Sequence, residues 1–142
     1  MKPDDLSGAR SALERDTTID IVTVGAKTGR SRKTEIWFIR VEGQVYICGT
    51  PGAAYRERER EPRDWLANLI ANPDFWFVLK ESESLSLPAR ASRVTDEAER
   101  RRVFSSPQAA WYREQTGSLD ALVDFGPMVR VEFIGEAAEL NG

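Results

Sequence analysis

The sequence predicts an α+β fold that is mainly β: a small barrel or curled sheet of six or so mostly antiparallel strands with flanking short helices. Three observations predict it. Strand-like segments follow one another in pairs that short turns connect, and short turns join antiparallel strands. The expected helices are too few to cover both faces of a doubly wound parallel sheet. No linker is long enough to separate domains, so we expect residues 1–142 to form a single domain.

Six segments have the composition of strands. β-Branched residues dominate the first of them, and the second contains an apolar run at 36–39, which indicates burial on both faces. The last alternates apolar with charged residues, as a half-buried strand does. We expect strands at residues 17–24, 33–41, 45–48, 75–79, 85–94 and 128–134.

Four other segments are predicted to be helical. Apolar residues recur at helical spacing over 65–70, and Pro62 suits the first turn of that helix. Gly117 is a typical stop signal. We expect four helices: 7–15, capped by Ser7; Pro62 to the Asn72-Pro73 boundary; 96–104, capped by Thr95; and 108–116. Residues 1–16 then form an N-terminal segment, and residues 135–142 form a frayed tail.

The composition excludes several kinds of active site. The 142 residues include no histidine and one cysteine, so a catalytic histidine base and zinc sites of histidines or four cysteines are excluded. No metal site is expected. No disulfide can form within the chain, which fits a cytoplasmic protein. A net charge of −3 argues against general binding to nucleic acid, and no apolar run approaches the roughly 18 residues of a membrane span. Proton transfer is left to Asp, Glu, Lys or Tyr, or to a cofactor.

A glycine-containing loop between the first two strands is the most distinctive motif. Residues 25–34 carry two glycines, three hydroxyls and four cations, which are Lys27, Arg30, Arg32 and Lys33. Backbone N–H groups freed by glycine, together with Lys and Arg, suit an anionic group such as phosphate. The loop is not a Walker A motif, because its glycine spacing is one residue short and a strand follows it. A solvated basic hairpin is the alternative.

Two further segments can contribute to a pocket. The segment Cys48-Gly49-Thr50-Pro51-Gly52 leaves a strand with small residues, which allow a flat ligand to approach the backbone. Trp65 and Asn68 are three residues apart on one helical face, where the indole can lie on a flat ring and the amide can bond to it. The alternatives are an ordinary turn, a core tryptophan and a helix-end amide.

In this order and spacing, the motifs resemble the deazaflavin-dependent nitroreductase family. Its members are split β-barrel reductases of quinones and nitro compounds, related to the FMN-binding split barrels. The resemblance covers roughly residues 19–94. It consists of the strand 19–24, Gly25-x-Lys27-Thr28-Gly29-x-x-Arg32, an apolar strand, the small-residue loop 49–52, and Trp65-x-x-Asn68-Leu69-x-Ala71-Asn72-Pro73.

The resemblance implies roles for individual residues. Lys27 and Arg32 match positions that bind the coenzyme phosphate, the backbone of 34–37 follows the deazaflavin ring, and 50–52 hold the ring's other side or its phosphate. Trp65 lies near the ring and the substrate. The cofactor-binding residues so implied are Lys27, Ser31, Arg32, Thr34, Ile36, Trp37, Thr50, Pro51, Gly52, Trp65 and Asn68. Tyr112 is the candidate catalytic residue, as the donor of the substrate proton, with water and the coenzyme as alternative donors.

The chain also departs from the family pattern. Relatives often carry Ser-Lys-Gly-Gly where this chain has Thr50-Pro51-Gly52-Ala53, so one phosphate-binding cation is missing. Glu35 replaces a proline that is common before the second strand, and the tyrosine-rich substrate segment is only faintly present around Trp111-Tyr112.

The function that the resemblance implies is hydride transfer from reduced coenzyme F420 to a quinone, a nitro compound or an activated alkene. The alternatives are an FMN-binding split-barrel oxidoreductase, and a non-enzymatic carrier of a hydrophobic small molecule such as a fatty acid or haem. We expect a small-molecule substrate, no nucleic-acid partner and no integral membrane segment. The apolar segment Phe75-Trp76-Phe77 is either core or a face for a homodimer.

Overall fold

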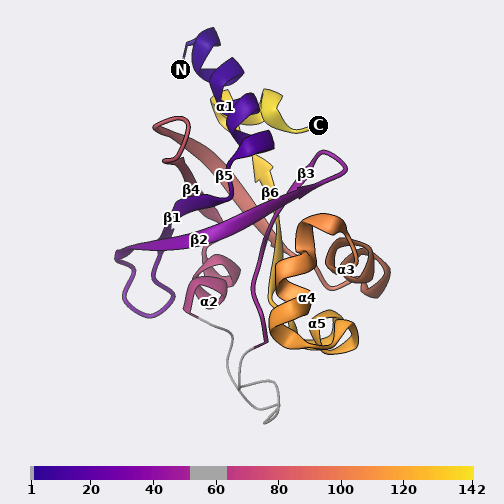
Figure 1. Ribbon diagram of the computed structural model, residues 1–142. Coiled ribbons are helices and arrows are strands. Elements are labelled where there is room, and N and C mark those ends of the chain that lie inside the picture. The colour runs from indigo at the N-terminus through magenta and orange to yellow at the C-terminus, as the bar shows by residue number, and fades with distance from the viewer. Residues whose placement is uncertain (1, 52–63) are drawn as a thin grey trace.

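Six antiparallel strands close into a barrel in the computed structural model, which describes residues 2–51 and 64–142 (Figure 1). Neighbouring strands follow the order β1-β2-β3-β6-β5-β4, and β4 pairs with β1 to complete the ring. The predicted α+β, mainly β architecture with antiparallel strands is therefore confirmed. The strands are β1 (Thr18–Val24), β2 (Ser31–Val41), β3 (Gln44–Cys48), β4 (Asp74–Leu79), β5 (Leu85–Arg93) and β6 (Met128–Phe133).

Alternate residues of each strand fill the barrel with apolar side chains, because successive side chains of a strand point to opposite faces of the sheet. The ring of Phe77 is completely buried and meets the edges of Phe38 and Phe133, with ring centroids 5.3 and 5.2 Å away. The segment Phe75-Trp76-Phe77 is thus mainly core. Trp76 points outward and is 49% exposed, and the homodimer stays a prediction.

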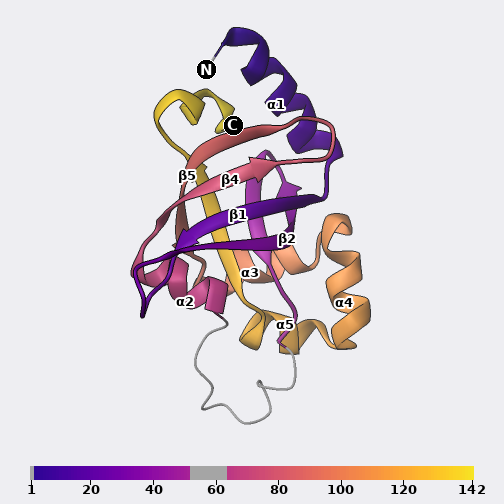
Figure 2. The ribbon, with the colours of Figure 1, turned by 90° about the vertical axis from the view of Figure 1, so that its left-hand side faces the viewer.

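Helices cover one outer face of the barrel and form a second apolar core there. These helices are α3 (Glu97–Phe104), the short 3-10 helix η2 (Pro107–Ala109), α4 (Ala110–Thr116) and α5 (Leu119–Phe125). They bury Ile39, Tyr46 and Met128 on the outer side of β2, β3 and β6. By contrast, Figure 2 shows β1, β4 and β5 with no helix in front of them. Within the described residues, no helix has the length and apolar character needed to cross a bilayer.

The sequence did not predict α5. Its N-cap is Ser118, whose hydroxyl accepts a hydrogen bond from the Ala121 N–H at 3.1 Å. The preceding Gly117 has a φ of 74°, so the chain reverses within one residue between α4 and α5. Gly117 is therefore a stop signal, as predicted, and the segment after it starts a new helix.

Two helices pack side by side at one end of the barrel, α1 (Pro3–Arg15) and the 3-10 helix η3 (Gly135–Leu140) (Figure 1). The predicted frayed tail is therefore wrong. Ala137 and Leu140 are buried, and the Arg10 guanidinium donates a hydrogen bond to the Glu139 carbonyl at 2.7 Å. These contacts repay the entropy of ordering the tail.

The predicted helix caps are also wrong at two positions. The first helix begins at Pro3, four residues before Ser7, because proline suits a first turn. At α3 the cap is Asp96 and not Thr95, since the Asp96 carboxylate accepts from the Glu99 N–H at 2.9 Å. The remaining helix, α2 (Asp64–Ala71), ends as predicted, and its predicted first-turn residue Pro62 lies outside the described residues.

A buried carboxylate on the outer face of β1, Asp20, makes stability depend on pH. Asp20 is 6% exposed, and its carboxylate lies 2.9 Å from Lys80 Nζ and 3.4 Å from Lys33 Nζ. Burial alone raises the pKa of Asp20, but the two ammonium groups outweigh it and hold the pKa below 3.8. Backbone N–H groups at the start of β1 likewise lower the pKa of the Glu81 carboxyl below 4.5.

We therefore expect the free energy of unfolding to be nearly constant between about pH 5 and 8, where a histidine would titrate and this chain has none. A carboxylate whose pKa is lowered by folding contributes fully above its unfolded pKa, and that contribution is lost as pH falls through the folded value. The free energy of unfolding should therefore decrease once the pH drops below 3.8–4.5, the ordinary pKa values of Asp20 and Glu81. Urea unfolding at a series of pH values measures this, and Asp20→Asn should flatten the acid limb.

Candidate functional site

One edge of β2 is open over its first seven residues. From Ser31 to Trp37, β2 pairs with β1, in a register that runs from Val24↔Ser31 to Thr18↔Trp37. On the other edge, β3 joins β2 only from Phe38 onward. In the part of the chain that the structure describes, residues 31–37 therefore have no strand partner on that second edge. Such an edge presents backbone donors and acceptors to a ligand.

A cavity of about 310 Å³ lies along this open edge. It is formed by β2, the end of β3, α2 and α4, and its lining residues are Thr34, Glu35, Ile36, Trp37, Cys48, Gly49, Thr50, Trp65, Trp111 and Tyr112. Six of these residues were predicted as site residues from segments far apart in the sequence: Thr34, Ile36, Trp37, Thr50, Trp65 and Tyr112. The fold thus brings the predicted ring-binding residues together.

Three aromatic side chains form one wall of the cavity. The rings of Trp37 and Trp111 lie 4.9 Å apart at an interplanar angle of 59°, and each residue is 43% exposed. The ring of Tyr112 meets Trp111 edge-on at 5.2 Å and 88°. Rigid aromatic surfaces of this kind suit a flat, largely apolar ligand. Trp111 was not among the predicted site residues. Its position next to Tyr112 on an amphipathic helix could have indicated that it lines the same cavity.

The Tyr112 hydroxyl is buried without a hydrogen-bond partner in the described residues. Tyr112 is only 3% exposed. Burial is the main cause that raises the pKa of its phenol, and the nearby Cys48 raises it further. The phenol therefore keeps its proton at neutral pH, and no acceptor among the described residues is within hydrogen-bond distance of it. Buried polar groups in proteins are otherwise nearly always paired. Burial also raises the pKa of the Cys48 thiol, so this thiol is not a nucleophile at neutral pH.

The glycine-containing loop between β1 and β2 folds as a tight turn. The Gly25 N–H donates to the Arg30 carbonyl at 2.8 Å, and the Gly29 N–H donates to the Gly25 carbonyl at 2.9 Å. Gly29 has a φ of 69°, a conformation that favours glycine. A side chain at Gly25 would lie 2.6 Å from the Thr28 hydroxyl, so the turn also needs this glycine.

The predicted phosphate-binding residues lie at the far end of the open edge. Lys27 and Arg32 are exposed and do not line the cavity, and the same holds for Ser31, which was predicted only as cofactor-binding. Arg32 precedes Trp37 by five residues on the same strand, a separation of about 17 Å at the rise of a β-strand. The cations thus lie further along the strand than the aromatic wall, and because Arg32 and Trp37 are an odd number of residues apart, their side chains project to opposite faces of β2.

Asn68 connects α2 to this loop. Its side-chain oxygen accepts from the Ala26 N–H at 2.9 Å, its NH2 group donates to the Thr23 hydroxyl at 3.4 Å, and the residue is 7% exposed. Asn72, one turn later, donates to the Val24 carbonyl at 3.4 Å. The Asn68 amide thus holds the cationic loop on α2.

We expect Asn68→Ala to lower the free energy of unfolding by about 1–3 kcal/mol, since it leaves the Ala26 N–H without its acceptor. Because the loop also carries Lys27, the affinity for an anionic ligand should fall together with stability. Asn68→Asp keeps the acceptor and should restore most of the stability. Thermal unfolding and ligand titration of both variants measure the two effects, and a stable Asn68→Ala protein would contradict this role.

The small-residue segment after β3 is described only in part. Thr50 lines the cavity and Pro51 is buried. The predicted site residue Gly52 lies outside the described residues.

The sequence profile of the F420H(2)-dependent quinone reductase family matches residues 7–121, and the chain belongs to this family. The match extends from the first helix into α5, so it includes every site residue described above. Coenzyme-dependent reduction of quinones is the activity after which the family is named.

Solved structures of remote relatives share the fold. A conserved hypothetical protein from Mycobacterium tuberculosis is 16% identical with a TM-score of 0.59, over 92% of this chain and 79% of that one. A candidate pyridoxamine 5'-phosphate oxidase from Listeria innocua is 12% identical with a TM-score of 0.60, over 92% and 94%. An F420-H2 dependent reductase is 21% identical with a TM-score of 0.51, over 82% and 95%. At these identities the similarity concerns the fold alone.

Proposed function

We propose that this protein is an oxidoreductase that uses reduced coenzyme F420 to reduce quinones. One observation carries the proposal: a cavity at an open strand edge combines a wall of aromatic rings with a buried phenol that has no hydrogen-bond partner among the described residues. Membership of the F420H(2)-dependent quinone reductase family supports it. The absence of histidine from the chain is compatible with it, because a redox coenzyme brings its own chemistry.

The residues of the site fit a deazaflavin coenzyme. The backbone of 34–37 offers an unpaired strand edge to the heterocycle, with Trp65 and Thr50 at the same cavity. Lys27 and Arg32, with the Ser31 hydroxyl, would hold the phosphate about 17 Å along the strand. When bound, reduced F420 supplies the hydride.

Tyr112 has one proposed task toward the substrate. Its raised pKa keeps the O–H in place as a hydrogen-bond donor, and a donor fixed in a buried site stabilises negative charge that develops on a quinone oxygen. Because the same raised pKa makes this phenol a poor acid, we propose that water supplies the proton to that oxygen. Nitro compounds and activated alkenes also develop negative charge on oxygen as they accept a hydride, so they are proposed as further substrates.

The proposal is tested by titrating the purified protein with F420 and, separately, with FMN, and following fluorescence. Saturable binding of F420, and oxidation of reduced F420 that depends on added quinone, are the expected results. Saturation by FMN alone would support an FMN-dependent oxidoreductase instead. A co-purified hydrophobic ligand without any turnover would support a carrier, and absence of F420 binding would remove the proposal.

A further inference from the structure

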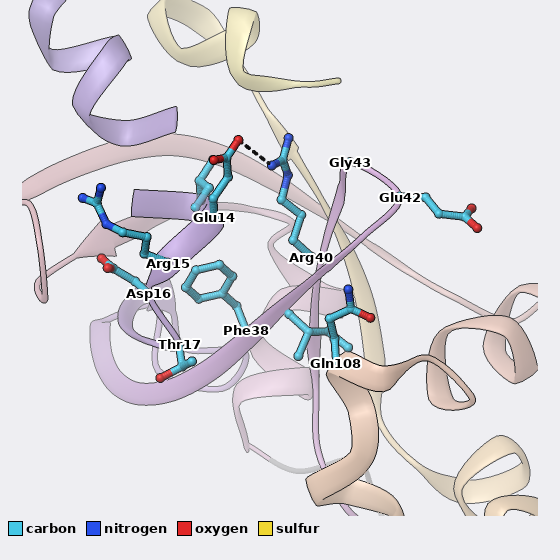
Figure 3. Close-up of a pocket in the computed structure, with 11 residues that line it drawn as sticks. Glu14, Arg15, Asp16, Thr17, Phe38, Arg40, Glu42, Gly43 and Gln108 are labelled. Carbon is cyan, nitrogen blue, oxygen red and sulfur yellow. Dashed lines mark hydrogen bonds and ion pairs between the residues drawn. The ribbon is translucent and has the colours of Figure 1, made fainter. Parts of the chain in front are cut away.

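Arg100, in α3, places its guanidinium among backbone carbonyls. In the part of the chain that the structure describes, no carboxylate forms an ion pair with it, whereas the Arg40 guanidinium lies 3.5 Å from the Glu14 carboxylate (Figure 3). Burying a cation costs free energy unless its donors are bonded, and burial lowers the pKa of Arg100. All three guanidinium nitrogens are bonded to main-chain oxygens: Nε to Val123, Nη1 to Val94, and Nη2 to Leu122 and Gly126.

These carbonyls belong to two segments that meet beside α3. Val123 lies in the last turn of α5, where carbonyls lack partners within the helix and a cation is favoured by the helix dipole. Its carbonyl is 2.7 Å from Arg100 Nε. Val94 follows β5, its carbonyl is 3.0 Å from Nη1, and its own N–H donates to the Met128 carbonyl at 3.1 Å. Arg100 therefore fastens the end of α5 to the junction of β5 and β6.

This fastening reaches the reductase cavity through Gly126 and Pro127. The carbonyl of Pro127, the residue after Gly126, accepts a hydrogen bond from the Gly49 N–H at 3.0 Å. Gly49 and its neighbour Cys48 both line the cavity. Burial raises the pKa of the Cys48 thiol, and the charge of Arg100 partly opposes this effect, so the guanidinium lies close behind this part of the lining.

A second path leads from Arg100 through Phe104 to Tyr112. The Arg100 Cζ lies 5.7 Å from the centroid of the Phe104 ring, one turn further along α3, which is within the range of a cation–π contact. The Phe104 ring is completely buried and meets the Tyr112 ring at 6.5 Å and 65°. A side chain at Gly126 would come within 2.9 Å of the Phe104 ring, so the segment that Arg100 holds also packs on this ring.

We propose that Arg100 is a positioning residue of the reductase cavity, which holds the Tyr112 phenol and the segment at Gly49 in place along the open edge of β2. The proposal rests on the proposed reductase function, in which this phenol donates a hydrogen bond to the substrate. A misplacement of about 1 Å can cost a large part of a rate enhancement. Loosening the end of α5 should therefore slow the reaction, although Arg100 itself does not line the cavity.

Amide hydrogen exchange tests the fastening without coenzyme or quinone. Arg100→Lys keeps the positive charge, but a lysine ammonium cannot reproduce the planar fork that reaches four carbonyls. We expect the Gly49 N–H to exchange about tenfold faster or more in this variant. The Ala26 N–H, which Asn68 holds in the turn between β1 and β2, should keep its rate. An unchanged rate at Gly49, or an equal acceleration at both amides, would overturn the proposal.

Steady-state kinetics test the consequence for the reaction. Arg100→Lys should lower kcat/KM for a quinone about tenfold. In a Tyr112→Phe background the same change should cost less than about twofold, because both residues act through one hydroxyl. Equal losses in the two backgrounds, or no loss in either, would contradict this role. Arg130→Lys is the matched control, since Arg130 also contacts α3, at Glu99, but does not line the cavity, and it should leave kcat/KM unchanged.

Gly126→Ala is a second variant, which disturbs the same contact and leaves Arg100 in place. Its added methyl group would press on the Phe104 ring, so kcat/KM should fall and the fall should again depend on Tyr112. Thermal unfolding verifies that each variant is folded. If the unaltered protein failed to oxidise reduced F420 with a quinone, the proposed function would be wrong, and the exchange rate of Gly49 would still decide whether Arg100 holds this segment.

Discussion

Replacing Lys27 and Arg32 together by alanine is expected to weaken F420 binding by about 100-fold or more, because two charge-assisted contacts to a phosphate are lost. Both side chains are exposed at the end of the open β2 edge that we propose as the coenzyme site. The backbone hydrogen bonds that form the turn come from Gly25 and Gly29, so the fold should be preserved. Fluorescence titration with F420 gives the affinity, and thermal unfolding gives the stability.

The matched control is Lys2→Ala with Arg93→Ala, which changes the net charge by the same two units at exposed positions away from this edge. It should leave the F420 affinity nearly unchanged at physiological ionic strength, where charges beyond about 8 Å are screened. If both double variants lost affinity equally, the effect would be one of overall charge. If neither lost affinity, Lys27 and Arg32 would not bind the phosphate.

The strands, and the segments that line the cavity at the open edge of β2, could be predicted because their signals are local. β-Branched composition, a two-residue turn and period-two alternation each operate within one strand, and all six predicted strands exist within a few residues of their predicted limits. The apolar run 36–39 was misread in one respect. Trp37 is 43% exposed, since this part of β2 has a neighbouring strand on one edge only. The apolar composition of a segment does not indicate whether a second strand or a ligand covers its side chains.

The parts that could not be predicted depend on contacts between distant residues. Asn68 holds the N–H of Ala26, 42 positions earlier in the chain, and no local pattern distinguishes it from a helix-end amide. The tail is ordered because it packs on α1. In the Arg10–Glu139 contact, the two residues are 129 positions apart in the chain. The unpartnered hydroxyl of Tyr112 is likewise a property of the assembled cavity. The sequence therefore predicted segments that line the cavity, and only the fold determined which of their side chains are structural.

Tyr112→Phe is expected to separate catalysis from stability. The phenol has no partner in the described residues, so its removal should leave the free energy of unfolding unchanged or raise it by up to about 1 kcal/mol. If Tyr112 donates a hydrogen bond to the reacting oxygen, kcat/KM for a quinone should fall about 10- to 100-fold. The affinity for F420 should change little, because the ring edge and the cations remain. Steady-state kinetics, urea unfolding and F420 titration measure the three quantities.

Tyr46→Phe is the matched control, because it removes a buried phenol that has a hydrogen-bond partner within the protein. The Tyr46 hydroxyl donates to the Glu99 carboxylate at 2.8 Å, and the residue is 1% exposed behind the helices that cover β3. Its loss should cost about 1–2 kcal/mol of stability and leave kcat/KM unchanged. The two variants should therefore show opposite patterns, since the Tyr46 hydroxyl is hydrogen-bonded to Glu99 and the Tyr112 hydroxyl has no partner among the described residues. A Tyr112→Phe protein that is destabilised and fully active would show that its hydroxyl has a structural role.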